Sequence, residues 1–187
     1  MKMKFKALAL LAGLLCINGA ALAEEENFAK ALFTLARQKE IVPVDNKQYK
    51  DECGSCHFAY QPGLLPSKSW EKLLTADALS KHFGENAELD NDTLKVIHDY
   101  AIANAADKSF HKRSRKIAIA TEKVEAPLRI TEVSYIKRKH HEIPEKMVKG
   151  NKDVKSLSYC DACHTQAANG VFDADTVKIP NFSDWDD

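Results

Sequence analysis

Apolar residues recur at helical spacing through the first half of the chain and predict three helices there. The first is expected over 27–39, the second from Pro66 past Trp70, and the third from Asn91 to about Ala106. The apolar face of the third helix would consist of Leu94, Ile97, His98, Ala101, Ile102 and Ala105. The first half of the chain is therefore expected to be helical.

The apolar pattern weakens from Lys116 to Asp187, where no long helix is predicted. Apolar residues in this part suggest only short extended pieces, at Ile117, Ile119, Ile130, Val133, Tyr135 and Ile136. A segment of about 70 residues with so little pattern would not build a hydrophobic core alone, and small domains of this kind need a metal or another staple.

The first residues have the pattern of a signal peptide. A lysine-rich start precedes an apolar run from Ala7 to Ile17, and a small-x-small site follows at 21–23. We expect cleavage after Ala23, which makes 1–23 a signal peptide and places the mature protein in the periplasm. A retained N-terminal anchor is the alternative, but the run is short for a membrane span. A lipid anchor on Cys16 is disfavoured because bulky Leu14 and Leu15 precede it.

The charges are balanced, with 27 basic and 27 acidic residues. Loss of Lys2, Lys4 and Lys6 with the signal peptide would leave a small acidic excess. Nothing in this charge distribution suggests a nucleic-acid partner. No segment after the signal peptide has the length and hydrophobicity of a transmembrane helix.

Two copies of one motif carry the chemistry of the chain. They read Cys53-Gly54-Ser55-Cys56-His57 and Cys160-Asp161-Ala162-Cys163-His164. The pattern C-x-x-C-H is the attachment signature of a c-type haem, because two thiols at this spacing can add to the two vinyl groups and the histidine can bind the iron. The sequence therefore predicts two covalently bound haems, with His57 and His164 as proximal ligands.

Two other readings of the four motif cysteines are weaker. They could form one zinc site together, or pair as two disulfides in an oxidising compartment. Either reading leaves the histidine that follows each motif as a coincidence. The fifth cysteine, Cys16, lies in the expected signal peptide.

The order of these features predicts the architecture. Helix, haem motif, loop and two further helices are the order of a small class I cytochrome c, which we expect over 24–115. Residues 116–187 would form an irregular domain with little secondary structure that wraps the second haem. The expected fold class is therefore mainly α.

The remaining ligand of each iron decides its chemistry. Methionine gives a high reduction potential, histidine generally a lower one, and an open position permits ligand binding or catalysis. Only Met147 remains after the signal peptide, so two methionine-ligated haems are excluded. Five histidines lie outside the motifs: His82, His98, His111, His140 and His141. His98 is more simply a residue of its helix face, and His111 lies in a basic run that suggests a solvated surface.

Several stretches of the chain resemble the periplasmic dihaem cytochromes c known as DHC. They are 52–66, which contains the first motif, followed by Ser69-Trp70, 82–87, 104–107, 129–132, 139–144, and the second motif with Gly170-Val171-Phe172. The resemblance covers nearly all of the expected mature chain.

This resemblance implies two low-spin haems with two histidine ligands each. His82 would be the second ligand of the first iron and His140 that of the second, with His141 as the alternative. It also implies an electron carrier rather than an enzyme. This carrier would reduce a small oxygen-binding monohaem cytochrome c. We further expect a monomer that receives electrons from an upstream donor, for which a membrane-bound protein is a candidate. A dihaem peroxidase or reductase with one open iron is the alternative function.

Overall fold

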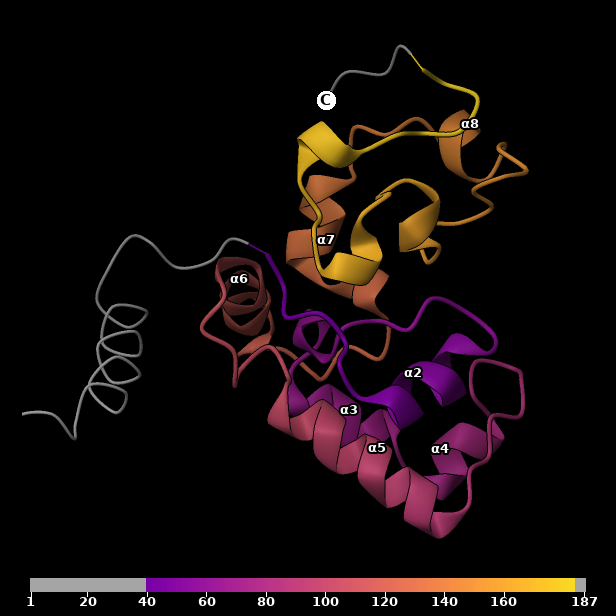
Figure 1. The fold of residues 1–187 in the computed structure, drawn as a ribbon. Helices are drawn as coiled ribbons and strands as arrows, with labels where there is room; N and C mark the ends of the chain where they lie inside the picture. The colour runs from indigo at the N-terminus through magenta and orange to yellow at the C-terminus, as the bar shows by residue number, and fades with distance from the viewer. Residues whose placement is uncertain (1–39, 184–187) are drawn as a thin grey trace, which may run out of the picture. The chain divides into compact units, whose positions relative to one another are not determined.

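Short helices joined by loops make up the computed structural model, which describes residues 40–183 (Figure 1). The expected signal peptide and the expected helix over 27–39 lie outside the described residues. The helices of the first half are α2 (Lys47–Gly54), α3 (Ser67–Leu73), α4 (Ala76–Ser80) and α5 (Asn91–Ala103), with a 3-10 turn η1 (Pro62–Leu64). The helices predicted near Trp70 and from Asn91 are thus confirmed.

Side-chain caps fix where three of these helices begin. Asn46 accepts a hydrogen bond from the backbone N–H of Tyr49 at α2, Thr75 caps α4, and Asp90 caps α5. Such caps satisfy backbone donors that have no partner within the helix. α2 carries the first cysteine of the first motif, and the sequence did not predict it because Tyr49 is its one buried residue.

The second half is helical where extended pieces were expected. It contains α6 (Lys112–Thr121), η2 (Ile130–Glu132), α7 (Ser134–Lys139), α8 (Glu145–Val148), η3 (Cys160–Ala162), η4 (Ala167–Asn169) and η5 (Ala174–Thr176). The expectation was therefore wrong for Ile117, Ile119, Ile130, Tyr135 and Ile136, whereas Val133 joins η2 to α7 with extended backbone. The buried face of α6 consists of Ser114, Ile117 and Thr121. Because two of these residues are polar, the apolar residues of α6 do not recur at helical spacing in the sequence.

Within residues 40–183 there are two isolated β-bridges, no named strands, and no helix long and apolar enough to cross a membrane. The chain is therefore mainly helical.

One continuous core joins the two halves. α5 packs against α2 and α3, and α6 contacts α7, as Figure 1 shows. Ile97 and Ala101 of α5 are fully buried, and Val133 and Tyr135 from the second half belong to the same core cluster. The domain boundary expected between 115 and 116 falls inside α6, and all described residues belong to one compact unit.

Two glycines let the chain approach Ile41 closely. A Cβ on Gly63 would lie 3.0 Å from the Ile41 side chain, and one on Gly170 would lie 2.0 Å from the Ile41 carbonyl oxygen. Gly170 also has a left-handed φ of 73° and accepts a hydrogen bond from the Ile41 N–H at 3.0 Å. The segment after the second motif is thereby attached to the start of the described chain.

We predict that Gly170→Ala lowers the free energy of unfolding of the holoprotein by about 2 kcal/mol or more, because a left-handed alanine costs about 1–2 kcal/mol before any clash is counted. Gly84→Ala meets nothing within 4 Å but has a φ of 105°, so it should show the conformational cost alone. Gly54→Ala, with ordinary contacts and no positive φ, is the control. Guanidinium unfolding followed by far-ultraviolet circular dichroism measures all three, and equal stability of the Gly170 and Gly54 variants would contradict the prediction.

Candidate haem sites

The end of α2 positions the first motif. Cys53 lies in the last turn of the helix and is half-buried, which, with the Glu52 charge as a smaller cause, raises the pKa of its thiol to about 11. Cys56 is exposed. The Nδ1–H of His57 donates to the Phe58 carbonyl at 2.7 Å, which leaves the Nε2 lone pair available to a metal.

A tight turn after α4 presents His82 to the first motif. Phe83 and Gly84 both have left-handed φ values, of 52° and 105°, and the Glu85 N–H donates to the His82 carbonyl at 3.1 Å. This is the geometry of a type I′ turn. The Arg129 guanidinium lies 3.9 Å from the centre of the Phe83 ring, and this cation–π contact stabilises the unusual backbone of an aromatic residue.

The structure brings the imidazole rings of His57 and His82 together. Their ring centres are 6.2 Å apart and their planes differ by 21°. A metal–imidazole bond is about 2 Å long and the ring centre lies about 1 Å beyond the nitrogen, so two imidazoles across one metal ion have centres about 6 Å apart. The separation of the first pair therefore matches that of two imidazoles bound to one metal ion.

The second motif lies in the 3-10 turn η3 rather than in a helix. Burial, with smaller contributions that include the Asp161 charge, raises the pKa of the Cys160 thiol to about 12. Burial first, and then His140 and Arg113, lower the pKa of His164 to about 4. His164 is therefore neutral, the form in which imidazole binds a metal. Its Nδ1 is buried without a hydrogen-bond partner among the described residues.

His140 faces the second motif from the end of α7. Its ring centre lies 6.0 Å from that of His164, with an angle of 77° between the planes. Its Nδ1–H donates to the Ile136 carbonyl at 2.8 Å. The neighbouring His141 is 66% exposed and contacts Glu142. The second pair thus has the same separation as the first but a crossed orientation.

The other two histidines do not join either pair. His98 is 37% exposed and lies beside Asp99. His111 is half-buried, and its Nδ1–H donates to the Glu40 carbonyl at 2.6 Å, so it is not the solvated residue that its basic neighbours suggested. Arg113 in the same run is also mostly buried, in ion pairs with Glu40 and Asp173.

A cavity of about 460 Å³ adjoins the second pair. Both cysteines of the second motif line it, together with His140 and His164. Its wall also includes Ile41 and Leu64 of the first half, and Lys112, Arg113, Lys116 and Ile117 of α6. A predominantly apolar wall with basic residues suits a flat apolar group that carries acidic substituents, as haem does. The donor set and the cavity both fit this group.

The zinc and disulfide readings have no support in the structure. Within residues 40–183, no three His, Cys, Asp or Glu side chains are grouped closely enough to hold a metal ion. None of the four motif cysteines forms a disulfide within residues 40–183. They therefore remain available as two separate pairs.

Comparisons with known proteins agree with the motifs. The sequence model of the family "Dihaem cytochrome c" matches residues 49–172. The solved dihaem cytochrome c of Shewanella baltica has 39% identity and a TM-score of 0.62, and the match covers 76% of this chain and 99% of that one. The dihaem cytochrome c of Rhodobacter sphaeroides has 39% identity and a TM-score of 0.61, and the match covers 70% of this chain and 99% of that one. No match was found among curated proteins.

The extent of the family match and the identity to solved structures identify the two C-x-x-C-H motifs as haem attachment sites. The chain belongs to the dihaem cytochrome c family and carries two covalently bound c-type haems.

Proposed function

We propose that this dihaem cytochrome is an electron carrier in which each iron is bound by two histidines. His57 and His82 would bind the first iron, and His164 and His140 the second. The observation that carries the proposal is the pair of imidazole separations, 6.2 Å and 6.0 Å, which match two rings across one metal ion. In this assignment His140 is preferred to His141 because His141 is exposed and directed to Glu142.

Two histidines per iron leave no open position for a substrate. Such a protein passes electrons between partners without binding a small molecule at the metal. A peroxidase or reductase would instead need an accessible iron with acid–base groups above it. The separations of the two imidazole pairs therefore favour the carrier over the enzyme.

For the partner and the compartment, the proposal rests on the sequence. The signal-peptide pattern of 1–23 supports export to the periplasm, and the resemblance to DHC supports a small oxygen-binding monohaem cytochrome c as the electron acceptor. A membrane-bound donor upstream and a monomeric state complete the proposal.

We predict that the reduced wild-type protein does not bind carbon monoxide at neutral pH, whereas His82→Ala and His140→Ala each open one iron. Loss of one ligand should produce a carbon monoxide-dependent shift in the Soret band for about half of the haem. His98→Ala and His141→Ala are matched controls that should stay unreactive. A shift in the wild-type spectrum, or robust peroxidase turnover, would contradict the proposal.

We predict two different low-spin signals in the electron paramagnetic resonance spectrum of the oxidised protein. Nearly parallel imidazole planes act on the same iron d orbital and separate the d levels, whereas crossed planes leave two of them close in energy. The 21° pair should therefore give an ordinary rhombic signal, and the 77° pair a more anisotropic one with a larger maximum g. Two identical signals would be inconsistent with these angles.

We predict that reduction of the partner cytochrome slows as ionic strength rises, because exposed charges steer the encounter and salt screens them. The exposed basic residues at the end of α7, Lys137, Arg138 and Lys139, are the source of this steering. Lys137→Glu should reduce the second-order rate several-fold at low salt, while the exposed Lys123→Glu serves as control. Stopped-flow measurements of the second-order rate test this prediction. A rate that does not depend on salt concentration would contradict electrostatic docking.

A further inference from the structure

The ring of His164 is held differently from those of two other proposed ligands. His57 and His140 each donate Nδ1–H to a backbone carbonyl, which fixes the rotation of the imidazole. The corresponding atom of His164 is buried and lacks a partner within residues 40–183. Some other contact must therefore determine the plane of this ring.

The ring of Phe172 makes such a contact. Its ring centre lies 5.2 Å from that of His164, at an angle of 65° that is typical of an edge-to-face pair. Phe172 follows Gly170, whose carbonyl receives the Ile41 N–H. The position of the Phe172 ring therefore depends on how this segment is held.

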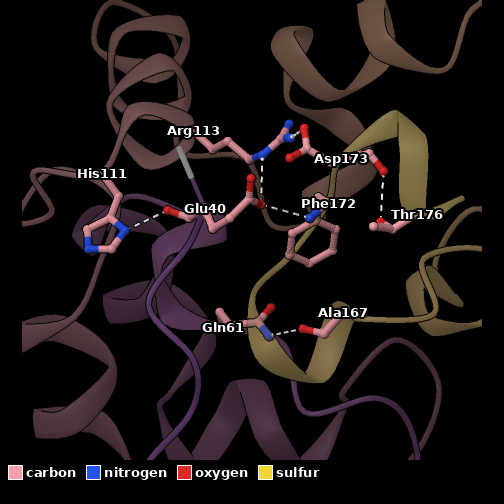
Figure 2. A network of polar contacts seen from close by, with 8 residues as sticks. All are labelled: Glu40, Gln61, His111, Arg113, Ala167, Phe172, Asp173 and Thr176. Carbon is pink, nitrogen blue, oxygen red and sulfur yellow. Dashed lines mark hydrogen bonds and ion pairs between the residues drawn. The ribbon is translucent and has the colours of Figure 1, made fainter. Parts of the chain in front are cut away.

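Glu40 holds the backbone of Phe172 from a distant part of the sequence. Its Oε2 accepts a hydrogen bond from the Phe172 N–H at 2.9 Å and also contacts Arg113 Nε at 3.3 Å. Arg113 donates in addition to Asp173 at 3.0 Å, as Figure 2 shows. The Arg113 side chain is only 14% exposed, and charged hydrogen bonds with little solvent access are among the strong ones.

A neutral contact supports the same segment. The Gln61 amide donates to the Ala167 carbonyl at 2.5 Å, and Gln61 is fully buried (Figure 2). The segment that follows the second motif is thus attached to the first half at both of its ends, at Ala167 and at Phe172.

We infer that Glu40 and Arg113 form a clamp that sets the ring plane of His164 through Phe172, and with it the crossed arrangement of the second imidazole pair. Both are positioning residues, since their hydrogen bonds connect them to the ring only through Phe172 and Asp173. The inference deepens the proposed function and rests on it, because the ring plane matters only if His164 and His140 share one iron.

The test is the electron paramagnetic resonance spectrum of oxidised holoprotein carrying Glu40→Leu, which removes both contacts of the carboxylate. The anisotropic signal should shift to a smaller maximum g or broaden, while the rhombic signal of the first site stays unchanged. Glu40→Gln keeps an acceptor for the Phe172 N–H but loses the ion pair, so it should give a smaller change in the same signal. Phe172→Leu removes the ring contact and should reproduce the full change.

Glu71→Leu on the exposed side of α3 is the matched control and should leave both signals unchanged. Haem content per chain and the unfolding midpoint are measured for every variant, because general destabilisation lowers the midpoint without moving one signal selectively. If Glu40→Leu does not accumulate with two haems, Glu40→Gln and Phe172→Leu decide by the same criterion. An unchanged anisotropic signal in the folded variants overturns the clamp.

The two proposals fail in different ways. If the wild-type protein lacks two low-spin signals, or if His140→Ala leaves the anisotropic one intact, the ligand assignment fails. If the wild type behaves as proposed and the Glu40 and Phe172 variants match it, only the clamp fails.

Discussion

The ligation proposed for the two irons places one requirement on the fold: each haem must be held from both faces by imidazoles about 6 Å apart. The covalent motif supplies one imidazole, and the chain must return to supply the other. In the first half a type I′ turn after α4 makes this return, with Phe83 kept in a left-handed conformation under Arg129. In the second half the end of α7 does so, where the Ile136 carbonyl fixes the His140 ring. Both solutions use short helices and turns, which explains why the fold needs no sheet to build the two sites.

The two sites share one structural framework. Ile41 touches Gly63 and Gly170, which follow the first and the second motif by the same distance in sequence. The wall of the second cavity includes Ile41 and Leu64 of the first half, and the core includes Tyr135 from the second half. The second half therefore does not wrap its haem alone but uses the first half as part of the pocket. This resolves the difficulty that a segment with so little apolar pattern poses for an independent domain.

Sequence reasoning reached the parts of the site that depend on local chemistry. The C-x-x-C-H motifs, the exclusion of two methionine ligands and the helix from Asn91 all follow from residue type and spacing. It missed α6, because Ser114 and Thr121 are buried polar residues that interrupt the apolar period. It also placed His111 and Arg113 on a solvated face, since a run of basic residues gives no sign that Glu40 and Asp173 pair with Arg113 across the fold. Contacts between distant segments leave no periodic trace in the sequence, and they are what assemble the second pocket.

The link from Glu40 to Phe172 has a consequence for the order in which the chain folds. Each imidazole pair joins residues about 25 positions apart, whereas this hydrogen bond joins residues separated by 132 positions. The entropy lost in closing a loop grows with its length, and long-range contacts slow the folding of small domains. The turn that brings His82 to His57 can therefore form early and locally. The pocket of the second haem is completed only when the chain after the second motif docks on Glu40, so we expect this region to assemble last.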